Sequence, residues 1–161
     1  MSLVTTLRQA DIFYELTPTQ LELVASICTE VTYNQGDIIF EEQTNGSEMY
    51  VIASGEVEIQ INPALIDKVG VSEPQTISVL RRGQSFGEIA LVDEGLRSAR
   101  ARVGQPDTHL IIIPREQLMY LCSTYPQMGF RLMRNLAADL AMKIRNTDLK
   151  VREYLLWRQR Q

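Results

Sequence analysis

Apolar and polar residues alternate along the middle of the chain, and this alternation predicts short β-strands. The runs follow one another from Val31 onward and read EVTY, DIIFEE, SEMYVIA, EVEIQI, QTISVL, SARARV and HLIIIP. Between them stand the turn-forming pairs Gly36-Asp37, Asn45-Gly46, Ser54-Gly55 and Arg82-Gly83. Many short strands joined by regular turns are typical of a sandwich or a closed barrel. Segment 62–74, which contains two prolines, predicts a loop instead.

Helical spacing appears on both sides of this region. Thr17-Pro18-Thr19-Gln20 has the form of an N-cap, a proline at the first helical position and a reciprocal capping partner. We therefore expect a helix from Pro18 to about Cys28, and its buried side should be formed by Leu21, Val24, Ala25 and Cys28. After Pro114 the run REQLMYLCSTY predicts a short helix.

Pro126 then opens a long helical run to about Trp157. An apolar stripe follows this helix and consists of Leu132, Met133, Leu136, Ala137, Leu140, Ala141, Ile144, Val151 and Leu155. The stripe needs a partner surface, either the barrel itself or a second copy of the helix in a short coiled coil. The second copy is favoured because about twenty residues extend beyond what a small barrel could cover.

Composition narrows the class of protein. The 161 residues, 45% of them apolar, suffice for one core, and a net charge of −4 gives no basic surface for DNA or RNA. The late cluster Lys143, Arg145, Lys150, Arg152, Arg158 and Arg160 is interleaved with acids, as on a solvated helix face. We expect no membrane span and no signal peptide. Two distant cysteines fit a reducing, cytoplasmic setting without a disulfide or metal site.

The single histidine argues against an enzyme. His109 lies in a strand-like run, where a packed or edge position is more common than a catalytic one. A metal-dependent dioxygenase or isomerase on a β-barrel would need several converging histidines or carboxylates. We therefore expect no catalytic residues and no bound metal or cofactor.

Residues 83–103, GQSFGEIALVDEGLRSARARV, contain the groups needed to bind a phosphorylated sugar. Gly87 lets the backbone approach a ligand, and a helix start after it presents N–H groups to an anion. Arg97 offers a two-pronged contact to phosphate oxygens, which Ser98 and the N–H of Ala99 extend. Ionised Glu88 only accepts hydrogen bonds, so it suits a sugar hydroxyl. The plain alternative is that Glu88 and Arg97 pair and hold a loop.

The segment SFGEIALVDEGLRSA resembles the phosphate-binding cassette of the cyclic nucleotide-binding domain family, which includes the catabolite activator protein and the regulatory subunits of protein kinase A. The upstream segment GDIIFEEQTNGSEMYVIASGEVEI is also similar to that family, and the resemblance covers about residues 13–144. It implies a mainly β fold with flanking helices. This is an eight-stranded antiparallel jelly-roll barrel, or cupin-like double-stranded β-helix, in residues 1–125, with residues 126–161 as a helical lid and dimerisation element.

The resemblance also implies a ligand, a cyclic nucleotide. This would be cAMP, with cGMP as the alternative. Arg97 would bind the cyclic phosphate and Glu88 the ribose 2′-hydroxyl. A residue of the long helix would contact the base, and two positions compete for this role, Lys143 by ungapped counting and Thr147 by local sequence. The implied binding residues are Phe86, Gly87, Glu88, Ile89, Ala90, Leu91, Arg97, Ser98, Ala99, Lys143 and Thr147.

Two functions follow as hypotheses. The first is a sensor domain that signals by repositioning its long helix, as a homodimer acting on an effector protein or domain. No helix-turn-helix domain follows the helix in this sequence, so we expect a stand-alone sensor or a fragment of a longer regulator. The second is a dimerisation or docking module that keeps the fold but binds cyclic nucleotides weakly or not at all.

Overall fold

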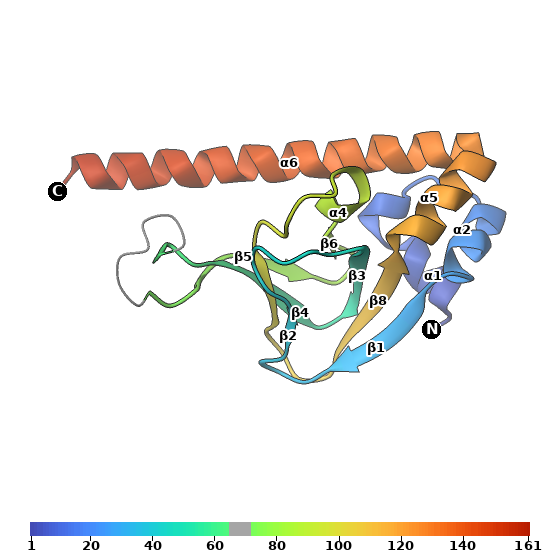
Figure 1. Ribbon diagram of the computed structural model, residues 1–161, viewed down its shortest axis with the longest axis horizontal. Coiled ribbons are helices and arrows are strands. Elements are labelled where there is room, and N and C mark those ends of the chain that lie inside the picture. Colours follow the sequence, from blue (N-terminus) through green and yellow to red (C-terminus); the bar gives the residue numbers. More distant parts are fainter. Residues whose placement is uncertain (65–71) are drawn as a thin grey trace.

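The computed structural model describes residues 1–64 and 72–161 (Figure 1). Its elements are α1 (Leu3–Arg8), the 3₁₀ helix η1 (Asp11–Phe13), α2 (Pro18–Ala25), β1 (Thr29–Tyr33), β2 (Ile38–Phe40), β3 (Glu48–Ser54), β4 (Glu56–Ile61), β5 (Gln75–Arg81), β6 (Ser85–Phe86), α4 (Ile89–Val92), β7 (Arg100–Val103), β8 (Thr108–Pro114), α5 (Arg115–Thr124) and α6 (Pro126–Gln159).

The strands form two four-stranded antiparallel sheets in the order β1-β8-β3-β6 and β2-β7-β4-β5. This is the jelly-roll arrangement expected from the sequence, with N-terminal helices and a long C-terminal helix. All seven strand-like runs form strands, and the two-residue strand β6 lies between β5 and α4. Predicted loop 62–74 lies partly outside the described residues, at 65–71.

Strand β3 shows how one sequence pattern supplies two cores. Met49 and Val51 pack under the helices, whereas Tyr50 and Ile52 face the second sheet. Successive side chains of a strand point to opposite faces, so a strand covered on both sides needs apolar residues at every position. One core therefore lies between the first sheet and helices α1, α2, α5 and α6, and the other lies between the two sheets.

Helix α2 begins as predicted and ends earlier than predicted. The hydroxyl of Thr17 accepts from the N–H of Gln20, and the Gln20 side chain accepts from the N–H of Thr17, which completes a capping box. The helix ends at Ala25 because the next two bonds, from Ile27 to Val24 and from Cys28 to Ala25, tighten to a three-residue spacing before β1. Leu21 and Val24 are buried, but Ala25 and Cys28 are only half-buried.

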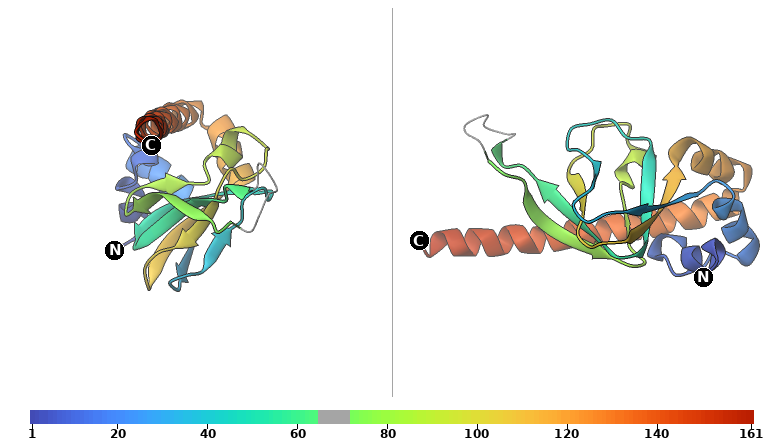
Figure 2. Two further views of the ribbon diagram at one scale, coloured as in Figure 1. Left: turned by 90° about the vertical axis from the view of Figure 1, so that its left-hand side faces the viewer. Right: turned by 90° about the horizontal axis from the view of Figure 1, so that it is seen from below.

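Helix α6 runs along the whole molecule (Figure 1). Its first part is packed, with Met128, Leu132 and Leu136 almost fully buried. Its second part passes over α4 and then alongside the β4–β5 hairpin (Figures 1 and 2). There the predicted stripe becomes exposed, since Ile144 and Val151 are 61% and 51% accessible. No helix in the described part of the chain is long and apolar enough to cross a membrane.

Candidate functional site

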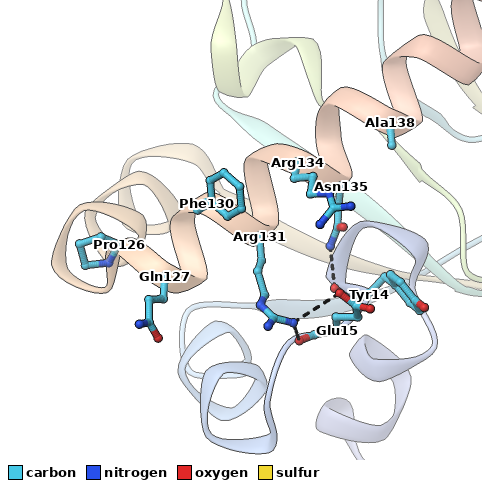
Figure 3. Close-up of a pocket in the computed structure, with 9 residues that line it drawn as sticks. All are labelled: Tyr14, Glu15, Pro126, Gln127, Phe130, Arg131, Arg134, Asn135 and Ala138. Atoms are coloured by element: carbon cyan, nitrogen blue, oxygen red, sulfur yellow. Dashed lines mark hydrogen bonds and ion pairs between the residues drawn. The ribbon is translucent and has the colours of Figure 1, made fainter.

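Helix α6 borders two hollows of different character. The larger, of 1110 Å³, lies between the second half of α6, the turn from β6 to α4 and the β4–β5 hairpin, and we call it the α6 cavity. The smaller, of 780 Å³, lies where the start of α6 meets η1 (Figure 3). It is lined by Tyr14, Glu15, Pro126, Gln127, Phe130, Arg131, Arg134, Asn135 and Ala138.

The smaller hollow serves to anchor α6. Asn135 donates from its side-chain amide to the carbonyl oxygens of Ile12 and Tyr14, at 3.0 and 2.7 Å. Arg131 donates to the carbonyl of Glu15 at 2.8 Å (Figure 3). These bonds satisfy carbonyls at the end of η1 that its own short turn leaves free. They join the first half of α6 to η1 and the segment that follows it.

The turn from β6 into α4 forms one wall of the α6 cavity and requires glycine. Gly87 has a φ of +74°, in the left-handed region that side chains disfavour. A Cβ there would stand 2.8 Å from Nη1 of Arg97 and 3.2 Å from the carbonyl oxygen of Glu48. Helix α4 follows as the single turn expected from the sequence, Ile89–Val92.

Arg97 reaches into this wall from the segment before β7. It is 7% exposed and donates to the carbonyls of Glu48, at 2.8 Å, and Gly87, at 3.1 Å. Its guanidinium lies 4.2 Å from the centre of the Phe40 ring, a cation–π distance. Nε is buried without a hydrogen-bond partner among the described residues. Burial lowers the pKa of Arg97, but the guanidinium stays charged at neutral pH.

The backbone of Arg97 is held as firmly as its side chain. Its N–H donates to the carbonyl of Thr44 and its carbonyl accepts from Gln43, both at 2.8 Å. The loop between β2 and β3 therefore places Arg97, although these residues are far apart in the sequence. A stacked pair of rings, Tyr50 and Phe86, lies beneath, with centroids 5.0 Å apart.

The plain alternative was that Glu88 and Arg97 pair with each other. The structure shows a different partner for Glu88, Lys143. Glu88 is 5% exposed, and its Oε1 lies 2.8 Å from Nζ of Lys143 on α6. The same ammonium donates to the carbonyl of Ser85 at 2.8 Å and lies 2.9 Å from Oδ2 of Asp139. Oε2 of Glu88 is buried and has no hydrogen-bond partner within the described segments.

Ten of the eleven predicted binding residues line the α6 cavity: Phe86, Gly87, Glu88, Ile89, Ala90, Arg97, Ser98, Ala99, Lys143 and Thr147. Leu91 is different, because it is 1% exposed and packs in the core under the helices. Lys143 lies beside Glu88, and Thr147 lies one turn further along α6. The two candidates for the base contact therefore have different surroundings, since Lys143 contacts Glu88 and Thr147 lies one turn further along the cavity wall.

Sequence reasoning missed the opposite wall of the cavity and the support of Arg97. The wall is apolar and includes Ile59, Ile61, Ile77 and Val79 of the hairpin. Their alternation identified them as strand residues, but no local signal marked the face that would meet α6. Glu48 and Phe40, which contact Arg97, were assigned only to strands for the same reason.

These features define what the cavity can bind. A buried guanidinium suits an anion, a buried carboxylate oxygen suits a hydroxyl donor, and the apolar hairpin suits a flat ring. In the described part of the chain, no group of three or more histidine, cysteine or acidic side chains is arranged to hold a metal ion. The arrangement favours recognition of a small molecule with a phosphate, a hydroxyl and a planar group.

Comparison with known proteins points to the same class. Residues 30–125 match the family model described as cyclic nucleotide-binding domain. A relative from Thermus thermophilus, described as a cyclic AMP receptor protein, is 34% identical over 90% of this chain and 62% of its own length. Human cGMP-dependent protein kinase 2 is 31% identical over 63% of this chain but 13% of its own length. The chain thus spans less than two thirds of either relative.

Solved structures share the fold. The Thermus thermophilus catabolite activator protein aligns with a TM-score of 0.74 and 32% identity, over 90% of this chain and 63% of that one. A cyclic nucleotide-binding domain from Methylobacillus flagellatus aligns with a TM-score of 0.78 at 20% identity, over 94% and 82% of the two chains. At that identity the second likeness concerns the fold alone.

Proposed function

Since the chain belongs to the cyclic nucleotide-binding domain family, we propose that it is a sensor domain that binds 3′,5′-cyclic AMP in the α6 cavity. The observation that carries this proposal is the pair of buried charged groups at the β6–α4 turn. Arg97 and Glu88 line the same cavity, and each keeps one buried polar atom without a partner among the described residues. Burying such atoms is costly unless a ligand engages them.

In the proposed orientation, the phosphate end of the ligand lies at the β6–α4 turn and the base lies toward the hairpin. The cyclic phosphate of the ligand binds at Arg97, Ser98 and Ala99, and its 2′-hydroxyl donates to Oε2 of Glu88. The base then extends between the apolar hairpin and the face of α6 that carries Thr147. Adenine is the proposed base because a relative that covers 90% of this chain is described as a cyclic AMP receptor protein, and cGMP is the alternative.

The signal is a change in the position of α6. The helix is anchored by Arg131 and Asn135, and beyond them it forms a wall of the binding cavity. A ligand that contacts both the β6–α4 turn and α6 shifts the helix by its differential affinity for the two positions, typically about 1 to 3 kcal/mol. An effector protein or domain would receive this shift, in the cytoplasm.

The exposed stripe on the second half of α6 binds a second copy of the chain, next to the α6 cavity that Ile144 and Val151 also line. Ile144, Val151 and Leu155 follow one another at coiled-coil spacing and are 61%, 51% and 49% exposed. Pairing two such helices would remove these side chains from water, which stabilises the association.

The proposal is tested by titrating the protein with cAMP in a calorimeter. Arg97→Ala leaves a phosphate poorly compensated in a partly dry site, which costs about 2 to 5 kcal/mol and lowers the affinity at least ~30-fold. A ligand at one hundred times its dissociation constant adds about 2.7 kcal/mol of stability, so wild type should also melt at a higher temperature with cAMP. Wild-type affinity in Arg97→Ala would refute the assignment.

One observation favours a docking module as the second candidate. Arg97 already donates to two carbonyls, and Lys143 already occupies one oxygen of Glu88, so the cavity is partly satisfied from within. A melting scan distinguishes the two candidates. The docking module predicts no shift with millimolar cAMP, cGMP or other cyclic nucleotides.

A further inference from the structure

Phe40, the last residue of β2, places its ring against the guanidinium of Arg97. The register between β2 and β7 shifts between Ile38 and Phe40, and a bulge of this kind redirects a side chain. The ring of Phe40 lines the α6 cavity, and its centre lies 4.2 Å from the guanidinium carbon of Arg97. Phe40 therefore belongs to the phosphate end of the cavity as well as to the core between the sheets.

Two further aromatic side chains hold the ring of Phe40 in place. Its centre lies 5.8 Å from that of Tyr50 and 6.0 Å from that of Phe86, with the planes tilted by 39° and 40°. Aromatic rings at such distances attract one another beyond the effect of burial alone. Because Tyr50 and Phe86 are themselves buried, the ring of Phe40 has little freedom to turn away from Arg97.

Uncharged groups hold the guanidinium of Arg97. Both of its hydrogen bonds go to carbonyl oxygens, and among the described residues it forms no ion pair with a carboxylate. Glu48 supplies one of these carbonyls, but its carboxylate accepts from the hydroxyl of Tyr50 at 3.0 Å. Burial raises the pKa of Tyr50, so this hydroxyl remains a donor at neutral pH. The positive charge of Arg97 is therefore not neutralised by any carboxylate that contacts it in the described part of the chain.

An aromatic face can stabilise a cation without neutralising it. The face of a ring such as Phe40 carries partial negative charge, and its attraction for a guanidinium grows where water is excluded. A carboxylate in the same place would also stabilise Arg97, but it would compete with a phosphate for the same N–H groups and repel the incoming anion. The ring has no net charge, so it causes no such repulsion.

We propose that Phe40 is a positioning residue that stabilises the charged guanidinium of Arg97 through its ring face and leaves that charge to be neutralised by the phosphate of the ligand. The inference rests on the proposed function for the identity of the ligand. It goes beyond that function because it names the side chain that prepares Arg97 for an anion.

A fluorination series at position 40 tests the electronic role of the ring. Phe40 is replaced site-specifically by 4-fluoro-, 3,4,5-trifluoro- and pentafluorophenylalanine, which nearly keep its shape and progressively remove the negative charge of its face. We expect cAMP affinity, measured by calorimetric titration, to fall at each step and at least ~10-fold for the pentafluoro ring. Pentafluorophenylalanine at position 130 is the control, because Phe130 is 69% exposed and does not line the α6 cavity.

Ordinary substitutions separate attraction from packing. Phe40→Leu should lower cAMP affinity at least ~10-fold, and Phe40→Tyr, which keeps an aromatic face, should restore most of it. Tyr33→Leu removes a partly buried ring from the same core cluster, away from the cavity, and should leave affinity unchanged. If Phe40→Leu binds weakly while the fluorinated proteins bind like wild type, the ring acts by packing alone and the proposal is overturned.

A double-mutant cycle in the ligand-free protein distinguishes failure of this proposal from failure of the proposed function. Urea unfolding is compared for wild type, Phe40→Leu, Arg97→Met and the double variant. We expect Phe40→Leu to lower the folding equilibrium constant at least ~3-fold more in wild type than in Arg97→Met. Equal effects in both backgrounds would overturn the stabilisation of Arg97 by Phe40, even if cAMP binds. Coupling without any binding of cyclic nucleotides would support that contact and refute the sensor function.

Discussion

Gly46 lies flat against the guanidinium of Arg97, so that a Cβ at position 46 would overlap Nε, Cζ and Nη2. The contact joins the β2–β3 loop to the phosphate end of the cavity. The same loop binds the backbone of Arg97 through Gln43 and Thr44. The guanidinium of Arg97 therefore fits against the β2–β3 loop only because position 46 has no side chain.

Gly46→Ala should displace the Arg97 side chain. Overpacking of this kind costs about 1 to 3 kcal/mol of stability, and the displaced guanidinium should lower cAMP affinity at least ~10-fold. Urea unfolding and calorimetric titration measure the two effects. Gly104→Ala is the matched control, because the nearest atoms to a Cβ there belong to the flexible side chains of Glu56 and Glu58, at 3.1 Å or more, and Gly104 does not line the α6 cavity. Equal behaviour of the two variants would contradict the seating of Arg97 by Gly46.

Arg97→Lys should retain the charge and lose the recognition. A lysine ammonium cannot reproduce the fork that donates to Glu48 and Gly87 and faces the phosphate. We expect cAMP affinity to fall at least ~10-fold, measured by titration. The control is Arg102→Lys, in a half-exposed pair with Glu58 at 3.0 Å, which should leave affinity unchanged. If Arg97→Lys binds like wild type, a point charge suffices and the two-pronged contact is wrong.

The sequence predicted the strands well and the site only in part. Period-two alternation and turn glycines are local signals, so the seven strand runs could be found without knowing their partners. Gly87, Glu88 and Arg97 could be proposed because they stand in one continuous stretch. Counting along the helix from Pro126 selects Lys143, but as a contact to the base. Its pairing with Glu88 depends on how α6 crosses the sheets, which no local pattern records.

Leu91 is a residue that the sequence places in the binding site but the structure places in the core. It stands in the GEIAL run, and the sequence predicts that it contacts the ligand together with its neighbours. Helix α4 has only one turn, and one side of it must face the core. Leu91 takes that side and Ile89, 40% exposed, takes the other. A run of sequence therefore identified the turn but could not tell which residues face the cavity.

Leu155→Asp should abolish self-association if α6 pairs with a second copy. The stripe of Ile144, Val151 and Leu155 would then carry a buried charge in each chain, which is costly without a partner. Sedimentation velocity at micromolar concentration should show a dimer for wild type and a monomer for the variant. Leu156→Asp is the control, because Leu156 is 52% exposed, close to the 49% of Leu155, but lies off the stripe. Loss of the dimer in both variants, or in neither, would contradict pairing through this stripe.

Cys28 should make the fold sensitive to alkaline pH. Burial, followed by the nearby charge of Glu30, raises the pKa of its thiol from 9.0 to about 12. Above pH 9 the unfolded chain therefore releases this proton while the folded chain keeps it. The stabilising contribution is complete below pH 9 and is lost as the pH rises toward 12, at up to about 1.4 kcal/mol per pH unit.

Urea unfolding of wild type and Cys28→Ala from pH 7 to pH 10.5 measures this loss. The substitution adds a constant packing cost, but only wild type loses the thiol contribution. The stability difference between them should be constant up to about pH 8.5 and then shrink. Tyr33 and Tyr50, whose pKa values burial also raises, are present in both proteins and cancel in the difference. A difference that stays constant to pH 10.5 would mean that the thiol of Cys28 ionises equally in the folded and unfolded chains.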